Sequence, residues 1–130
     1  GGFVLPEFNY CREGILTSGL IASILENKIF LEILNYMKNY VQIREKIEMD
    51  SNHHDKIIEH LKNNLAKKYS EIITLDGIKA IIDEDTWVLI RKSNTEDIIR
   101  ISAESNNEEK CKIIINNIKE MVKERYDKIK

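Results

Sequence analysis

A short polar segment, residues 91–96, carries the side chains of this sequence best suited to chemistry. Arg91 has a planar guanidinium that can bind a phosphate group through two hydrogen bonds at once. Ser93 and Thr95 add hydroxyl groups and Asn94 adds an amide, and a turn here would also direct backbone N–H groups into a hollow. A phosphate dianion requires this combination of charge and donors, so the segment predicts a phosphate-binding loop.

Two charged residues near the loop have roles that the spacing leaves open. Glu96 would repel a phosphate, so we expect it to hold the loop or to orient Arg91 or Arg100. Arg100 either lines the site or pairs with Glu96 or Glu104. The alternative to a binding site is a surface hairpin in which the Ser, Asn and Thr side chains only satisfy the backbone of a turn.

The elements around the loop are those of a sheet backed by helices. Four stretches have the alternation or the apolar run of strands: Val41–Ile47, Ile72–Ile82 with a turn or bulge at Asp76-Gly77, Trp87–Ile90, and Ile98–Ala103. One amphipathic helix follows the cap types Asp50–Asn52 and runs to about Tyr69, and another starts at a capping box of Ser105 and Glu108. We expect an α+β, TBP-like domain whose antiparallel sheet of about four strands is covered on one face by two helices.

The first 39 residues predict less structure than a domain needs. They contain the end of one strand, a loop and two short helices, namely Phe3–Leu5, Asn9–Gly14, Ile15–Glu26 and Ile29–Met37. A single strand without partners cannot enclose a core, so we expect residues 1–39 to be the remnant of an α/β domain that begins before Gly1. Residues 40–130 form the second domain.

Composition argues against several classes of partner. The chain has 20 basic and 22 acidic residues, without the basic excess typical of nucleic-acid-binding proteins. A nucleic-acid-binding sheet would carry basic or aromatic residues on its open face, whereas we expect Trp87, the single tryptophan, to pack in the core. No apolar run reaches the roughly 18 residues of a membrane span, and no signal peptide is recognisable. We expect no nucleic-acid and no membrane partner.

The metal-binding and thiol residues predict little chemistry. His53, His54 and His60 lack a carboxylate partner at ligand spacing, so we expect a solvated helix start and no metal in this chain. Cys11 and Cys111 lie far apart and form no CxxC motif. Two reduced thiols are typical of a cytoplasmic protein.

Two separated motifs give the chain a family resemblance. Residues 91–100, R-K-S-N-T-E-D-I-I-R, resemble the R-P-S-G-T-E-P-x-x-R motif of the α-D-phosphohexomutases, which include phosphoglucomutase, phosphomannomutase and phosphoglucosamine mutase. Residues 76–79 and 87–90 resemble the D-G-V-K and W-V-L-V-R stretches that precede this motif. Residues 1–14 are similar to G-G-V-I-F-P-E-F-x-Y-C-R-D-G in the third domain of archaeal-type members.

The motifs differ from the family pattern at several positions. Lys92 and Asp97 replace prolines, so the backbone of the loop is less restricted. Asn94 replaces a glycine, and Asn tolerates a positive φ better than most residues. Glu13 stands where the family usually has Asp.

The resemblance implies an isomerase that interconverts hexose 1-phosphate and hexose 6-phosphate. In that family a phosphoserine of the first domain, with a bound Mg²⁺, gives its phosphoryl group to the sugar. The resulting bisphosphate reorients and returns its other phosphate. The serine and the Mg²⁺ site are expected outside this chain, which would be inactive alone and would depend on the missing N-terminal domains.

Residues 1–39 would then be the end of the third, sugar-binding domain, and residues 40–130 the fourth, phosphate-binding domain. The resemblance assigns the phosphate that is not transferred to Arg91, Ser93, Asn94 and Thr95, with Glu96, Arg100 and Arg12 in supporting positions. The alternative is a stand-alone, non-catalytic module that binds a sugar phosphate or another anion through the same loop.

Overall fold

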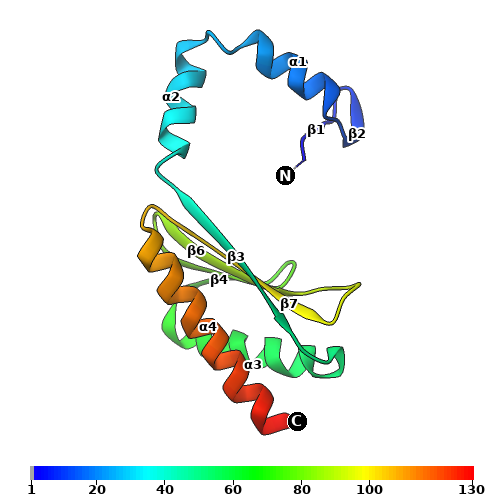
Figure 1. The fold of residues 1–130 in the computed structure, drawn as a ribbon, viewed down its shortest axis with the longest axis vertical. Coiled ribbons are helices and arrows are strands. Elements are labelled where there is room, and N and C mark those ends of the chain that lie inside the picture. The colour runs from blue at the N-terminus through cyan, green and yellow to red at the C-terminus, as the bar shows by residue number, and fades with distance from the viewer. Residues whose placement is uncertain (1) are drawn as a thin grey trace. The chain divides into compact units, whose positions relative to one another are not determined.

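The computed structural model describes residues 2–130 and divides the chain into two compact units (Figure 1). The N-terminal unit ends at Asn39, and the C-terminal unit runs from Tyr40 to Lys130. None of the helices within the described residues is both long enough and apolar enough to cross a bilayer.

The C-terminal unit is built on one antiparallel sheet with the strand order β3-β7-β6-β5-β4, so its first strand lies beside its last. The strands are β3 (Val41–Glu48), β4 (Glu71–Ile73), β5 (Ile78–Asp83), β6 (Thr86–Lys92) and β7 (Ile98–Ser105). Helices α3 (His54–Lys68) and α4 (Glu108–Ile129) both cover the same face of the sheet (Figure 1). The predicted α+β fold, an antiparallel sheet with two helices on one face, is confirmed.

The core lies between the sheet and the two helices. Successive residues of a strand point to opposite faces, so Val88 and Ile90 of β6 are fully buried under the helices while Leu89 faces the other way. Both helices and three of the five strands contribute fully buried apolar side chains: Ile57, Leu61, Ile78, Val88, Ile90, Ile99, Ile101 and Val122. Burying each such side chain contributes roughly 1.5–3 kcal/mol, so this core stabilises the platform that carries the loop.

The sheet has five strands rather than about four. The stretch expected to be one interrupted strand is a hairpin in which Glu71 of β4 pairs with Ile81 of β5. Gly77 makes the reversal possible with a φ of 97°, a conformation that favours glycine. A Cβ at Gly77 would lie only 2.3 Å from the carbonyl oxygen of Ile90. The Asp-Gly pair is therefore part of a reversal of the chain, not a bulge within one strand.

The start of α4 differs from the predicted capping box. Asn107 is the N-cap, and its side chain accepts the backbone N–H of Lys110 at 3.1 Å. Ser105 is the last residue of β7 and is fully buried, with its hydroxyl 3.0 Å from that of Thr86. The capping box was wrong because Ser105 is engaged within the sheet, and the chain leaves β7 before the helix begins.

The start of α3 follows a short 3-10 turn, η1 (Ser51–His53), which Asp50 caps by accepting the N–H of Asn52 at 2.9 Å. The prediction of a solvated start was wrong for His54, which is 2% exposed. Its Nε2 lies 3.2 Å from the carbonyl oxygen of Met49. The ring turns inward because this backbone oxygen provides the hydrogen-bond partner that a buried imidazole requires.

The N-terminal unit contains a two-stranded hairpin and two helices. Its elements are β1 (Val4–Leu5), β2 (Asn9–Arg12), α1 (Ile15–Ser23) and α2 (Lys28–Met37). The loop predicted through Arg12 is in fact strand β2, because a tight turn closed by the N–H of Phe8 on the carbonyl oxygen of Leu5 at 2.9 Å folds it back on β1.

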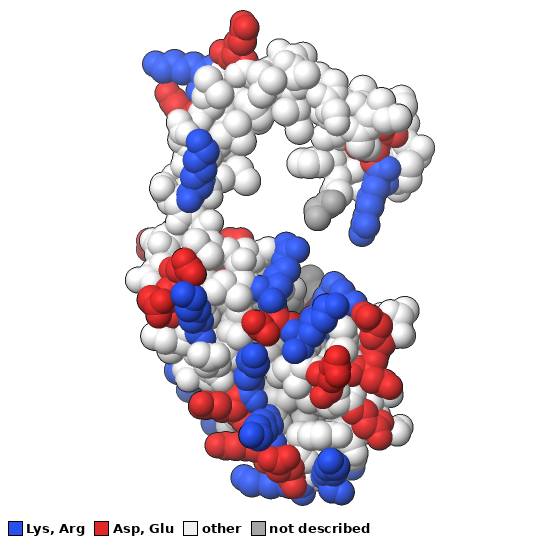
Figure 2. Space-filling model, in the orientation of Figure 1, with Lys and Arg blue, Asp and Glu red and all other residues white. Residues whose placement is uncertain are grey.

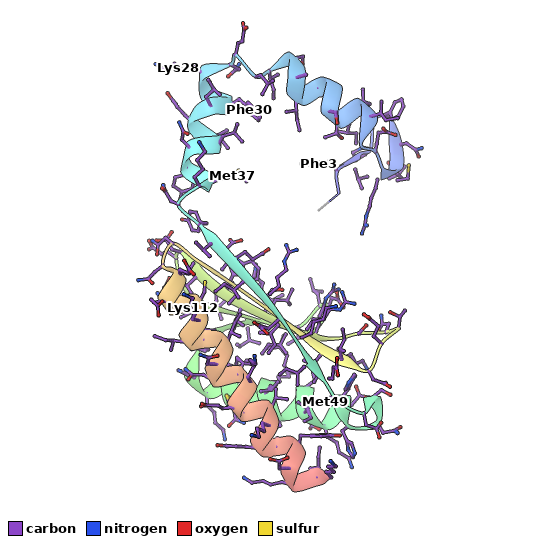
Figure 3. The ribbon with its side chains drawn as sticks, viewed as in Figure 1. Phe3, Lys28, Phe30, Met37, Met49 and Lys112 are labelled. Carbon is purple, nitrogen blue, oxygen red and sulfur yellow. The ribbon has the colours of Figure 1, made fainter. Side chains whose placement is uncertain are left out.

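Apolar side chains of the N-terminal unit are largely exposed. Thr17 is the only buried residue among residues 2–39. Phe3 and Met37, labelled in Figure 3, are 62% and 61% exposed. Within the described residues, this unit therefore encloses no apolar core of its own.

Candidate functional site

The predicted phosphate loop joins β6 to β7. The N–H of Ser93 donates to the carbonyl oxygen of Ile98 at 3.0 Å, which closes the loop, and the N–H of Thr95 reaches the hydroxyl of Ser93 at 3.4 Å. The N–H of Asn94 has no hydrogen-bond partner among residues 2–130. Of the N–H groups of residues 93–95, that of Asn94 is thus the available one, and Asn94 has no positive φ.

The guanidinium of Arg91 lies beside the turn between β4 and β5. Its Nη1 lies 3.0 Å from a carboxylate oxygen of Asp76, and the side chains are 46% and 80% exposed. Such an exposed pair contributes only about 0–1 kcal/mol to stability. Nη2 and Nε of Arg91 have no hydrogen-bond partner in the described part of the chain. Asp76 therefore orients the guanidinium from one side and leaves two nitrogen atoms for a ligand.

Lys92, which replaces a proline of the family motif, ties the loop to α3. Its Nζ lies 2.6 Å from Oδ1 of Asp55 in the first turn of that helix. The hydrogen bond and the positive charge of Lys92 lower the pKa of Asp55 below its ordinary value. Sequence reasoning missed this pair because the two residues are 37 positions apart and only the tertiary fold brings them together.

Arg100 fulfils two of the roles left open by the sequence. Its Nη2 forms an ion pair with Glu96 across the loop. Its side chain also borders a hollow on the open face of the sheet together with Arg91. Glu104 is not its partner, since Glu104 accepts the indole N–H of Trp87 at 3.0 Å.

Two hollows flank Arg91. The loop hollow, of about 300 Å³, is lined by residues that include Asp76, Gly77, Arg91, Lys92 and Asn94. The sheet-face hollow, of about 410 Å³, lies on the face away from the helices. Arg91 borders both, so the structure brings it together with Asn94 and Lys92 on one side and with Arg100 on the other.

Three predicted site residues are not among those that line the two hollows. Ser93 and Thr95 line neither of these two hollows, although Ser93 helps to shape the loop. Arg12 is exposed on β2 of the N-terminal unit, where its side chain packs beside Gly2. Within residues 2–130, no group of three or more His, Cys, Asp or Glu side chains is arranged to hold a metal ion.

Trp87 was predicted to lie in the core and instead lies half-buried on the open face of the sheet. The alternation of β6 gives the core side to Val88, which forces its neighbours to the opposite face. Lys79 covers the indole, with Nζ 4.6 Å from the ring centroid. Trp87 has apolar neighbours in the sequence, but these do not reveal which face of the sheet the helices cover.

Two basic residues of the open face, Arg44 and Lys46 of β3, were not among the predicted site residues. Both line the sheet-face hollow. The alternation of β3 already separated them from the apolar Val41 and Ile43. What the sequence lacked was the strand order, which sets β3 beside β7.

Comparison with known proteins identifies the family. Residues 40–121 match the model of the phosphoglucomutase/phosphomannomutase C-terminal domain. The chain is 34% identical to a protein of Methanobrevibacter smithii named "Probable phosphoglucosamine mutase" and 33% identical to the phosphoglucosamine/phosphogalactosamine mutase of Sulfurisphaera tokodaii, covering 95% and 94% of this chain. It is 36% identical, over 86% of its length, to the phosphoglucomutase/phosphomannomutase of Thermococcus kodakarensis.

The chain spans only part of these relatives, namely 29%, 27% and 25% of their lengths in the same order. The matched residues 40–121 include the loop and every residue that lines the two hollows described above. The chain thus belongs to the phosphoglucomutase/phosphomannomutase family and contains its C-terminal domain.

Proposed function

We propose that residues 40–130 hold a phosphate group of the substrate in a phosphohexomutase that interconverts hexose 1-phosphate and hexose 6-phosphate. The observation that carries this proposal is the state of Arg91: an exposed guanidinium at the rim of the loop hollow, oriented by Asp76 through one nitrogen. The mutase names of the relatives support the reaction type.

The loop would act by positioning the substrate rather than by breaking bonds. Arg91 supplies charge-assisted hydrogen bonds from Nη2 and Nε, and Lys92 and Asn94 supply further donors on the same hollow. Ser93 and Thr95 contribute their hydroxyl groups if their side chains rotate towards the ligand. Fixing one phosphate of the sugar restricts the other end of the molecule, which favours an in-line transfer.

The reacting groups belong, in this proposal, to parts of the enzyme outside the chain. These are the phosphoserine, which passes its phosphoryl group to the sugar through a bisphosphate intermediate, and the Mg²⁺ beside it. The residues described do not fit the metal, because no three candidate ligands lie together within residues 2–130. The chain alone would therefore bind substrate without turning it over.

The N-terminal unit would be the end of the sugar-binding domain. Its exposed apolar side chains, among them Phe3, Phe8 and Ile15, support this assignment because a folded enzyme seldom leaves so large an apolar surface uncovered. The remainder of that domain, preceding these residues in the intact enzyme, would cover them.

Arg91→Ala in the intact enzyme tests the proposal. A hydrogen bond to a charged group contributes about 1.5–3 kcal/mol, so we expect kcat/KM for hexose phosphates to fall roughly 10- to 100-fold, mainly through KM. Glucose, mannose and glucosamine phosphates are assayed in parallel. Lys67→Gln, which removes an exposed charge from α3, is the matched control and retains wild-type kinetics.

An unchanged kcat/KM in Arg91→Ala would remove the assignment of the loop. The stand-alone alternative makes a different prediction, because a non-catalytic module binds sugar phosphate while the intact protein shows no mutase turnover.

A further inference from the structure

We propose that the open face of the sheet carries a second phosphate-binding site, formed by Arg44, Lys46 and Arg100. We call it the sheet-face site. It is separate from the loop hollow, and it does not depend on the loop binding a ligand.

The register of three strands places like charges next to one another. Lys46 of β3 lies directly opposite Arg100 of β7, and Arg100 lies directly opposite Arg91 of β6. Arg44 follows on the same face of β3, opposite Ser102. Side chains opposite each other across strands have Cβ atoms only about 4.5–5.5 Å apart, so a row of cations is destabilising unless an anion compensates it.

Within the described chain, only some of these basic side chains have a carboxylate partner. Arg91 and Arg100 have the carboxylates of Asp76 and Glu96. Arg44 contacts only the neutral side-chain amide of Gln42. Lys46 has no hydrogen-bond or ion-pair partner among residues 2–130.

The carboxylates closest to β3 do not supply the missing charge. Glu45 is among the residues that line the sheet-face hollow, but its carboxylate pairs with Lys119 of α4 at 3.3 Å. Glu104 accepts hydrogen bonds from Trp87 and Gln42. Glu48, at the end of β3, forms no ion pair within the described residues and lines a different hollow. Arg44 and Lys46 of the sheet-face site therefore form no ion pair within the described residues.

The sheet-face hollow has room for an anion beside these cations. Its volume is about 410 Å³, its floor includes Trp87 and Leu89, and the hydroxyl of Ser102 lies between the basic strands as a further donor. Figure 2 shows Lys and Arg side chains gathered on the sheet side of the C-terminal unit. Basic side chains with a hydroxyl around a concave surface suit a phosphate group.

The spacing of the strands sets how far the basic residues of β3 lie from Arg91 of the loop. Neighbouring strands lie about 4.8 Å apart, so β3 is roughly 10 Å from β6 and its Arg91. Two sources share this chemistry: free phosphate, and the phosphate group of a hexose monophosphate. The second source rests on the proposed function, whereas the site itself does not.

A nucleic-acid backbone is the competing ligand, because the open face carries the basic side chains and the aromatic ring expected of a nucleic-acid-binding sheet. Two other observations favour it less. Trp87 is the only tryptophan of the chain, and its ring is covered by Lys79 instead of being free to stack on a base. The net charge of the chain is −2, so no general attraction to a polyanion is expected.

Trp87 provides the readout, because it lines the sheet-face hollow and is the single tryptophan. The 130-residue chain is titrated with inorganic phosphate at constant ionic strength while tryptophan fluorescence is followed. We expect a saturable change in wild type, and an affinity at least tenfold weaker in Arg44→Gln and in Lys46→Gln. Lys67→Gln on α3 is the matched control and titrates like wild type.

The loop variant Asn94→Ala separates this inference from the proposed function. A sheet-face site retains its phosphate response in Asn94→Ala. If Arg44→Gln and Lys46→Gln both titrate like wild type while folding normally by circular dichroism, the sheet-face site is overturned, whatever the loop does. A response that chloride reproduces, or that only an oligonucleotide elicits, overturns it as well.

The same variants identify the source of the phosphate group. If a hexose monophosphate is the source, hexose 1-phosphate binds the sheet-face site more tightly than inorganic phosphate does, and Lys46→Gln weakens its binding whereas Asn94→Ala leaves the tryptophan response in place. Equal affinities for hexose 1-phosphate and inorganic phosphate assign the site to a free phosphate group.

Discussion

Single charged residues around the loop are organised in pairs that reach across the fold. Arg91 pairs with Asp76, and Lys92 pairs with Asp55 of α3. Each pair is exposed, so it contributes little to stability but restricts where the basic side chain points. The basic groups near the loop are thereby oriented before any ligand binds, which reduces the entropy lost on binding.

The Lys92–Asp55 pair predicts a specific titration. The pKa of Asp55 is depressed by the hydrogen bond and charge of Lys92, so the pair contributes stability above the ordinary aspartate pKa and loses it as the pH falls through the depressed value. Lys92→Gln should raise the pKa of Asp55 towards its ordinary value. Nuclear magnetic resonance of the carboxyl carbon against pH measures this.

Lys110→Gln is the matched control for that titration, because Lys110 lowers the pKa of Asp83 in the same way. It should raise the pKa of Asp83 and leave Asp55 unaffected. A pKa of Asp55 that does not respond to Lys92→Gln would contradict the ion pair and, with it, the attachment of the loop to α3.

At the scale of elements, the turn between β4 and β5 positions Arg91 of the loop. Gly77 allows the chain to approach β6 so closely that a Cβ would lie 2.8 Å from Cβ of Arg91. This approach sets Asp76 within reach of the guanidinium. The resemblance of residues 76–79 to a family motif was visible in the sequence, whereas the contact of that motif with Arg91 was not.

Gly77→Ala should therefore destabilise the C-terminal unit and disturb Arg91 together. The strained φ alone costs about 1–3 kcal/mol, and the contact of 2.3 Å with the carbonyl oxygen of Ile90 adds to it. For a unit of this size we expect the melting temperature to fall by at least about 4 °C. Circular dichroism on heating measures the change.

Gly19→Ala is the control, because a Cβ at Gly19 in α1 meets nothing within 4 Å. An unchanged melting temperature in Gly77→Ala would contradict the tight approach of the turn to β6.

Local pattern and non-local topology account for what the sequence did and did not reveal. Alternation and helical periodicity depend on neighbouring residues, and they predicted β3, β6 and β7 and both helices over the sheet. The N-cap of α4 could not be predicted from local pattern, because Ser105 and Asn107 are both residue types that cap helices. The contact of Ser105 with Thr86, a residue of another strand, decides between them.

At the scale of the whole molecule, strand order is the feature that creates the sheet-face site. Arg44, Lys46 and Arg100 look unremarkable along the chain, and they become one cluster only because the order β3-β7-β6 aligns them. The phosphate loop, in contrast, is continuous in sequence, so its motif could be recognised directly. Sites assembled from several strands are for this reason the ones that sequence reasoning misses.

The two units should differ sharply in local stability. The C-terminal unit has an extensive buried core, whereas Thr17 is the only buried residue among residues 2–39. In hydrogen exchange of the 130-residue chain, amides of α1 and α2 should exchange much faster than those of β6 and β7, because local opening is easy where few apolar contacts are broken.

In the intact enzyme, where the rest of the sugar-binding domain would cover the exposed apolar side chains, α1 and α2 should become protected while β6 and β7 change little. Equal protection of α1 and α2 in both proteins would contradict the assignment of residues 1–39 to that domain and leave their apolar surface in need of another partner.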